Sequence, residues 1–198
     1  MVKALVLDFG GVLADEGFRE GLKAIARNNG LNPEEFFVVA RNLIYDTGYV
    51  TGETDEHAYW EALRVKTKVR NGDNELRREI LSRFVLRRPM LEEIRRVRAK
   101  GAIVALLTDQ TNWLDEINQQ EPFYQCFDHV FNSFSLKKSK RDATLFDDVA
   151  GQLGARPHEI LFADDTPENL ERAQARGWKT LRFTNVENFR KAIKEENI

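Results

Sequence analysis

The chain has 198 residues, a formal net charge of −2, and a composition that is 42% hydrophobic and 31% charged. This composition is typical of a folded globular protein and excludes a largely disordered chain, and the nearly balanced charge gives no nucleic-acid-binding signature. No apolar run is long enough for a membrane span or a signal peptide, and a single cysteine, Cys126, excludes an internal disulfide. We therefore expect a cytoplasmic protein without nucleic-acid or membrane partners.

The first apolar run, from Ala4 to Leu7, is followed directly by Asp8 and then by the pair Gly10-Gly11. A Val- and Leu-rich run of this length is typical of a strand that is buried on both faces of a parallel sheet. Ligands of open α/β sheets bind outside the carboxyl ends of the strands, so Asp8 would face a ligand. The glycines allow a sharp turn and a close approach of the backbone to that ligand.

The next part of the chain, about residues 15–87, shows only helical spacing. Four helices are expected: over 17–28, from Pro33 after an Asn32 N-cap, after a Thr54 cap, and from Asp73 or Asn74 to Leu86. Because they follow the first strand directly, they would form a small inserted bundle.

Strands and helices alternate in the rest of the chain. Expected strands cover residues 102–107, 130–134, 159–163 and 180–183, and expected helices cover 90–100, 111–118, 142–153, 167–176 and 186–195. Repeated strand–helix units predict an α/β fold, a doubly wound parallel sheet with helices on both faces. The chain would then consist of a core domain, 1–14 and 88–198, and a helical cap domain, 15–87.

Polar residues stand where the expected strands end. Thr108 and Asp109 follow the second strand. The Thr108 hydroxyl can hydrogen-bond a phosphoryl oxygen, whereas Asp109 can equally serve as a helix cap. Lys140 lies in a basic run before a helix and can neutralise anionic oxygens. Asp164 and Asp165 follow the fourth strand, and adjacent carboxylates repel one another unless a cation such as Mg²⁺ is present.

Taken in order, these segments resemble the motifs of the haloacid dehalogenase superfamily of aspartate-nucleophile hydrolases. The first motif stands here as Asp8-Phe9-Gly10-Gly11-Val12-Leu13. The resemblance implies the sheet order 3-2-1-4-5 and a helical cap at the first insertion point. It also implies a nucleophile, Asp8, two further catalytic groups, Thr108 and Lys140, which bind substrate together with Asp109, and a Mg²⁺ site made of Asp8, the Gly10 carbonyl, Asp164 and Asp165.

One position departs from the usual family pattern, because Gly10 stands where an aspartate commonly acts as general acid and base. Branches with this departure resemble sugar-phosphate phosphatases of the glucose-1-phosphate type. The resemblance therefore implies a magnesium-dependent phosphohydrolase that acts on a small phosphate ester, such as a sugar phosphate, through an aspartyl-phosphate intermediate. His57 and Asp109 are the two residues considered as replacements for the missing acid.

Two other functions remain open. Carbon–halogen hydrolases of the same superfamily also lack the second aspartate, but they need no metal and typically lack an acidic pair such as Asp164-Asp165. A phosphate-binding or regulatory protein with little turnover is the other alternative. The pair Asp164-Asp165 favours a phosphatase over a carbon–halogen hydrolase, and the presence of Asp8, Lys140 and Asp165 together favours an active enzyme over a binding protein.

Overall fold

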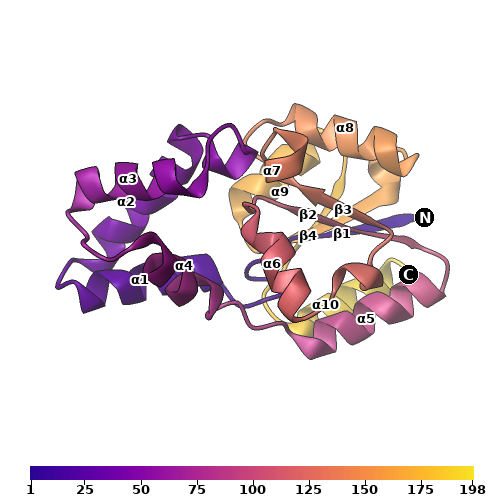
Figure 1. The fold of residues 1–198 in the computed structure, drawn as a ribbon. Coiled ribbons are helices and arrows are strands. Elements are labelled where there is room, and N and C mark those ends of the chain that lie inside the picture. Colours follow the sequence, from indigo (N-terminus) through magenta and orange to yellow (C-terminus); the bar gives the residue numbers. More distant parts are fainter.

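The computed structural model describes residues 1–198 as a parallel five-stranded sheet between helices, with a further group of helices beside it (Figure 1). The strands are β1 (Ala4–Leu7), β2 (Ile103–Thr108), β3 (His129–Asn132), β4 (Ile160–Asp164) and β5 (Lys179–Arg182). Their order in the sheet is β3-β2-β1-β4-β5, which confirms the predicted α/β fold and the order 3-2-1-4-5. All neighbouring pairs are parallel, so the strands' carboxyl ends meet at one edge.

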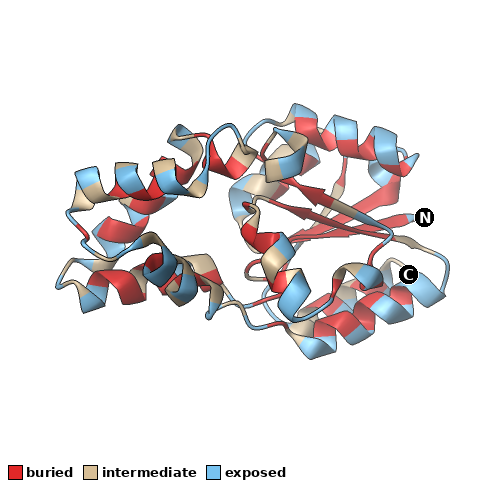
Figure 2. Ribbon diagram, in the orientation of Figure 1, coloured by how far each residue is buried: buried red, intermediate tan, exposed pale blue.

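The central strand β1 is completely buried, as its apolar composition predicts. Leu5 and Leu7 point to one face of the sheet, which is covered by α5 (Arg88–Ala99), α6 (Trp113–Gln120) and α10 (Val186–Glu195). Ala4 and Val6 point to the opposite face, which is covered by α8 (Thr144–Leu153) and α9 (Pro167–Ala175). Successive side chains of a strand alternate between faces, so one short strand supplies both apolar layers. Most of the sheet is buried, as Figure 2 shows.

The first four α-helices follow β1 in the sequence, as predicted, and pack together beside the sheet, whereas α5 covers the sheet (Figure 1). The four are α1 (Gly17–Asn28), α2 (Pro33–Asp46), α3 (Glu56–Thr67) and α4 (Asp73–Leu81), and a short 3₁₀ helix, η1 (Tyr49–Thr51), joins α2 to α3. We call α1–α4 the inserted bundle. Its own apolar cluster includes Leu22, Phe36 and Trp60, and Trp113 of α6 also belongs to it. Trp113 therefore packs the bundle against α6, which covers the sheet.

The start of α3 differs by one residue from the sequence prediction. The N-cap is Asp55, whose side chain accepts a hydrogen bond from the Ala58 N–H at 2.9 Å. The Thr54 hydroxyl instead donates to the Thr47 carbonyl at 2.9 Å. A carboxylate and a hydroxyl are both good N-caps, so adjacent candidates cannot be ranked by residue type alone.

Two other elements end earlier than predicted. Helix α4 stops at Leu81, and Leu86 lies in extended chain that forms a bridge with Ala14. Strand β3 stops at Asn132, whose side chain accepts a hydrogen bond from the Phe134 N–H and begins the short helix α7 (Ser133–Leu136). Two further 3₁₀ helices, η2 (Tyr124–Cys126) and η3 (Pro157–Glu159), lead into β3 and β4. Local capping thus overrides apolar spacing at the end of β3.

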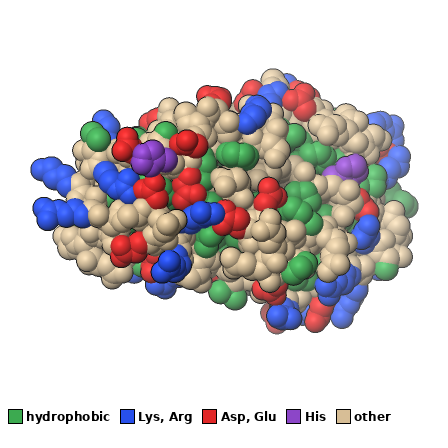
Figure 3. All heavy atoms as spheres, in the orientation of Figure 1, with side chains coloured by type: hydrophobic (Ala, Val, Ile, Leu, Met, Phe, Trp, Pro, Cys, Tyr) green, Lys and Arg blue, Asp and Glu red, His purple; other side chains and the backbone are tan.

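Acidic and basic side chains are interspersed over the face of the molecule in Figure 3. Many of these side chains form ion pairs, such as Arg83 with Glu79 and Arg98 with Asp128. No helix has both the length and the apolar character needed to cross a lipid bilayer.

Candidate active site

A cavity of about 590 Å³ opens at the carboxyl edge of the sheet, between the sheet and the inserted bundle. It brings together residues that lie far apart in the sequence, among them Asp8 after β1, Thr108 at the end of β2, Lys140 before α8 and Asp165 after β4. The sequence predicted all four for one site, because the carboxyl ends of parallel strands meet at the same edge. The bundle contributes the opposite wall.

Asp8 is buried, and one of its two carboxylate oxygens is held by the protein. Oδ1 accepts hydrogen bonds from the Phe9 N–H at 2.7 Å and from Lys140 Nζ at 2.9 Å. Oδ2 accepts none. Burial raises the pKa of Asp8 well above its ordinary value, and the charges of Asp164 and Asp165 add to this, while Lys140 acts in the opposite direction. The geometry leaves Oδ2 available to a ligand in the cavity.

Lys140 is the cation that holds the acidic residues together. Its side chain is only 2% exposed, and its Nζ lies 2.9 Å from Asp8 Oδ1 and 2.8 Å from Asp164 Oδ2. Burial alone would lower the pKa of Lys140, but the charges of Asp164, Asp8 and Asp109 outweigh burial and raise it. Lys140 therefore carries its full positive charge in the site.

The two acidic residues at the end of β4 are held differently. Both oxygens of Asp164 are occupied: Oδ1 accepts from the Thr166 N–H at 2.7 Å, and Oδ2 accepts from Lys140 Nζ and from Asn169 Nδ2. Asp165 accepts one hydrogen bond, from the Thr166 hydroxyl at 3.3 Å, through Oδ1. Its Oδ2 accepts none, and burial together with Asp164 raises the pKa of Asp165.

The carboxylates of this site suit a hard divalent cation. One oxygen each of Asp8, Asp164 and Asp165 lie within 4.8 Å of one another. Mg²⁺ takes oxygen ligands, commonly one or two carboxylates completed by water and phosphate, and its charge would relieve the repulsion that adds to the effect of burial on the pKa values of Asp8 and Asp165. Asp8 and Asp165 each retain an oxygen free of hydrogen bonds, whereas Asp164 has none to spare. The donor set therefore fits Mg²⁺ with Asp8 and Asp165 as ligands.

The two residues that follow β2 have different surroundings. Thr108 is buried at the end of the strand and lines the cavity. Asp109 connects three parts of the molecule: its Oδ1 accepts the Lys140 backbone N–H at 2.9 Å, and its Oδ2 accepts the hydroxyl of Tyr45 from α2 at 3.0 Å. Burial raises the pKa of Asp109, although Lys140 and Tyr45 act against this. These bonds position Lys140 and join the bundle to the sheet.

Glu16, which the sequence analysis did not select, also lies in this cavity. It precedes α1, and its Oε1 lies 2.8 Å from the point that a Cβ atom on Gly10 would occupy. Burial, assisted by the charge of Asp165, raises the pKa of Glu16 to about 7. A carboxyl group thus stands beside residue 10, where the sequence lacks one. Only its position shortly after the first motif could have indicated it.

Gly11 is required by the backbone next to these carboxylates. Its φ is +76°, in the left-handed region that side chains rarely adopt. A Cβ atom at this position would overlap the Asp165 carboxylate. The absence of a side chain at Gly11 therefore allows the first and fourth strand ends to approach each other.

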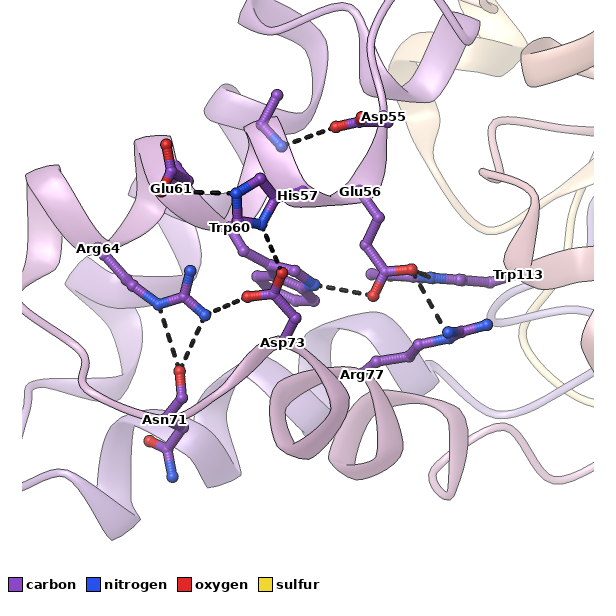
Figure 4. Close-up of polar contacts among 11 residues, drawn as sticks. Asp55, Glu56, His57, Trp60, Glu61, Arg64, Asn71, Asp73, Arg77 and Trp113 are labelled. Atoms are coloured by element: carbon purple, nitrogen blue, oxygen red, sulfur yellow. Dashed lines mark hydrogen bonds and ion pairs between the residues drawn. The ribbon is translucent and has the colours of Figure 1, made fainter.

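His57, one of the two residues considered for the missing acid, does not line the cavity. Figure 4 shows it on α3, where its Nδ1 contacts Asp73 Oδ2 at 2.8 Å, and its side chain is exposed. In the same view the Glu56 carboxylate accepts hydrogen bonds from the indole N–H groups of Trp60 and Trp113. This network is therefore part of the contact between the bundle and α6, and His57 is excluded as a proton donor at Asp8.

Comparisons of sequence support a hydrolase. The sequence model of the haloacid dehalogenase-like hydrolases matches residues 2–177. An enolase-phosphatase from Aquifex aeolicus (strain VF5) is 23% identical over 206 residues, which cover 91% of this chain and 89% of that protein. A bifunctional epoxide hydrolase from Rattus norvegicus is 28% identical over 103 residues, which cover 48% of this chain but only 18% of that protein. The chain therefore spans only a small part of the epoxide hydrolase.

Solved structures share the fold. A predicted hydrolase from Porphyromonas gingivalis superposes with a TM-score of 0.79 at 23% identity, covering 100% of this chain and 98% of that one. An enzyme from Bacteroides thetaiotaomicron, solved with magnesium and inorganic phosphate, gives 0.73 at 22% identity, covering 93% and 95%. An L-2-haloacid dehalogenase from Xanthobacter autotrophicus gives 0.69 at 18% identity, covering 100% and 84%. Since both phosphate- and halide-related proteins share this fold, the site must decide between them.

Proposed function

Because the chain belongs to the haloacid dehalogenase-like hydrolases, we propose that it is a magnesium-dependent phosphohydrolase that acts on a small phosphate ester through an aspartyl-phosphate intermediate. One observation carries the proposal. Asp8 is anchored through Oδ1 to Lys140 and presents Oδ2 to the cavity, beside an Asp164-Asp165 pair whose charges suit a metal ion. A carbon–halogen hydrolase would have no use for that pair.

In this proposal one domain carries the catalytic residues and a second domain selects the substrate. Residues 1–14 and 88–198 form the core domain and hold the nucleophile, Lys140 and the metal ligands. Residues 15–87 form a cap domain that closes the cavity and selects the substrate. The free thiol of Cys126 is buried, which suits a reducing compartment, and we extend the proposal to the cytoplasm.

The first chemical step is attack by the Asp8 carboxylate on phosphorus, which forms a P–O bond and breaks the bond between phosphorus and the ester oxygen. Lys140 Nζ holds Asp8 Oδ1, so the carboxylate is oriented before the substrate arrives. The Thr108 hydroxyl donates a hydrogen bond to a phosphoryl oxygen, and Lys140 offsets the negative charge on these oxygens. Asp8, Asp165 and the Gly10 carbonyl would hold Mg²⁺, which would supply further charge neutralisation when bound.

The released ester oxygen needs a proton, and Gly10 offers none. We propose that Glu16 supplies it, because its Oε1 lies where a side chain at residue 10 would reach. In the second step water attacks the phosphorus of the aspartyl phosphate, Glu16 takes the water's proton, and Asp8 leaves as a carboxylate. Asp109, whose two oxygens already accept hydrogen bonds from Lys140 and Tyr45, serves as a positioning residue.

The activity of one relative and the bound ligands of another support this proposal. The Aquifex aeolicus protein is an enolase-phosphatase and aligns with 91% of this chain. The Bacteroides thetaiotaomicron enzyme, which has the same fold, was solved with the metal and the product that we propose here.

The test is release of inorganic phosphate from p-nitrophenyl phosphate and from a panel of sugar phosphates, measured with Mg²⁺ and with EDTA. We expect release that depends on Mg²⁺ and that Asp8→Asn abolishes. Phosphate release that persists in Asp8→Asn would contradict the proposed nucleophile. Absence of phosphate release, together with halide release from 2-chloropropionate, would assign a dehalogenase instead. Binding of phosphate esters without turnover would indicate a regulatory protein.

A further inference from the structure

The bundle side of the cavity carries arginines that have no acidic partner. Arg19 of α1 and Arg41 of α2 both line the cavity, and neither forms an ion pair or donates a hydrogen bond. Of the arginines elsewhere on the bundle, Arg64 and Arg77 are paired with carboxylates, whereas Arg27 is unpaired but lies outside the cavity. The cavity is therefore a place where positive charge is left without a partner within the protein.

These two guanidinium groups contact the same aromatic ring. Phe37 is buried in α2, and the Arg19 and Arg41 guanidinium carbons lie 5.0 and 5.5 Å from its ring centre. Lys23 also approaches this ring, at 6.0 Å, but its charge is already paired with Glu34 at 2.8 Å. A cation–π contact at an exposed site contributes about 0.5–1 kcal/mol, which helps to place each guanidinium group near the Phe37 ring but leaves its hydrogen-bond donors free.

Paired guanidinium groups bind carboxylates and phosphates well. Each presents a planar fork of N–H donors that matches two oxygens of such a group, and a shared anion removes the repulsion between the two arginines. On the sheet side, Arg141, Arg172 and Arg182 line the same cavity, and none of these forms an ion pair either. The lining as a whole holds these five arginines and Lys140 beside five carboxylates, Asp8, Glu16, Asp109, Asp165 and Glu168, so the charges of the cavity nearly balance and the unpaired arginines on the bundle side mark where a second anion would bind.

The cavity joins the arginine pair to the nucleophile. Arg19, Arg41, Asp8 and Lys140 line one volume of about 590 Å³, which is within the range of small-molecule sites. We propose that the substrate carries a second anionic group, a carboxylate or a phosphate, and that Arg19 and Arg41 bind it while the scissile phosphoryl group lies at Asp8. This inference rests on the proposed function and narrows its substrates to phosphorylated carboxylic acids and bisphosphates.

The experiment compares pairs of phosphate esters of similar alcohols, in which only one member carries a second anion. Phosphoglycolate is paired with 2-hydroxyethyl phosphate, and fructose 1,6-bisphosphate with fructose 1-phosphate. The kcat/KM values are measured by phosphate release with Mg²⁺. We expect the wild-type protein to prefer the doubly anionic member of at least one pair. The pair that shows the preference distinguishes a carboxylate from a phosphate.

Arg41→Ala should reduce that preference about ten- to a hundredfold, since a hydrogen bond to a charged group is lost. Arg19→Ala should act in the same direction. Arg19 also lowers the pKa of Glu16, so Arg19→Ala can change the rate on every substrate. The readout is therefore the ratio of the two kcat/KM values within a pair, because an effect common to both members cancels. Arg41→Lys keeps the charge without the fork and should retain part of the preference. Arg27→Ala is the matched control: it lies on α1, forms no ion pair and is outside the cavity, so the ratio should stay unchanged.

Equal kcat/KM values within both pairs, or an Arg41→Ala variant that lowers both members equally, would overturn the inference. Failure of the proposed function looks different, because then p-nitrophenyl phosphate is not hydrolysed either. In that case calorimetric titration with the same pairs decides the matter. Tighter binding of phosphoglycolate or of the bisphosphate that Arg41→Ala removes supports the second-anion site, and equal binding within both pairs refutes it.

Discussion

Replacing Glu16 with glutamine tests the link between the missing side chain at residue 10 and the carboxyl group beside it. The substitution keeps the shape of the side chain and removes its ability to donate a carboxyl proton. General acid–base catalysis contributes about 10²–10⁴-fold to a rate. We therefore expect kcat on a sugar phosphate, a poor leaving group, to fall by about that factor in Glu16→Gln. The loss on p-nitrophenyl phosphate should be much smaller, because its leaving group departs without a proton.

The same variant should be more stable at alkaline pH. The folded protein raises the pKa of Glu16 from 4.5 to about 7, so stability falls as the pH rises through this window and the buried carboxyl group ionises. Such a shift corresponds to at most about 3 kcal/mol, and the partial exposure of Glu16 reduces this to about 1–2 kcal/mol. Glu16→Gln removes the penalty, so its melting temperature in EDTA should exceed that of the wild type at pH 8 and match it at pH 4.

The assays are steady-state kinetics on both substrates and thermal unfolding at the two pH values. Glu20→Gln is the matched control, because Glu20 lies one turn further along α1, is exposed and forms no ion pair. Loss of activity with a gain of stability identifies a group retained for function and not for folding. A kcat on the sugar phosphate within twofold of the wild type would refute the reasoning, since another group would then move the proton.

Three further substitutions follow from the geometry of the site. Gly10→Ala should lower activity with little change in melting temperature, because the new methyl group meets only the flexible end of Glu16. Gly11→Ala should lower both activity and melting temperature, because the new methyl group strains a left-handed backbone and overlaps Asp165. Lys140→Met should destabilise the protein by about 3–5 kcal/mol at pH 8 in urea unfolding, because the buried carboxylates of Asp8 and Asp164 lose their cation. The difference should shrink at pH 4 as Asp8, whose pKa is raised by burial, takes up a proton. Asp8→Asn should abolish phosphate release and leave the circular dichroism spectrum unchanged; a lost fold would contradict the role assigned here.

The sequence was most informative where the fold repeats a simple rule. Each of the strands β1, β2 and β4 is a short apolar run ending in a polar residue, and parallel pairing brings those ends together. This is why Asp8, Thr108 and Asp164 could be assigned to one site without knowledge of the tertiary structure. Even so, the family resemblance and not the apolar pattern supplied the strand order 3-2-1-4-5, since pattern alone does not fix which strands are neighbours.

The sequence was least informative about side chains whose partners are determined by the tertiary structure. Glu16 stands in an acidic pair before a helix, which is the usual place for a solvated cap residue, and its carboxylate forms no cap hydrogen bond. Its approach to Gly10 depends on the turn between β1 and α1. Likewise Asp109 resembled a helix cap, yet its oxygens accept hydrogen bonds from Lys140 and from Tyr45 of α2. Both contacts bridge residues whose proximity no local pattern encodes.

These two contacts share a consequence for how the site works. Glu16 is carried by the segment that leads into the bundle, and Asp109 positions Lys140 while it accepts a hydrogen bond from the bundle. Trp113, buried in the bundle's apolar cluster although it belongs to α6, fixes the bundle against the sheet. The proposed proton donor and the charge that orients Asp8 therefore both depend on the packing of the bundle against the sheet. An aspartate at residue 10 would lie on the sheet side and would not depend on that packing, so the proposed use of Glu16 makes proton transfer conditional on the position of the bundle.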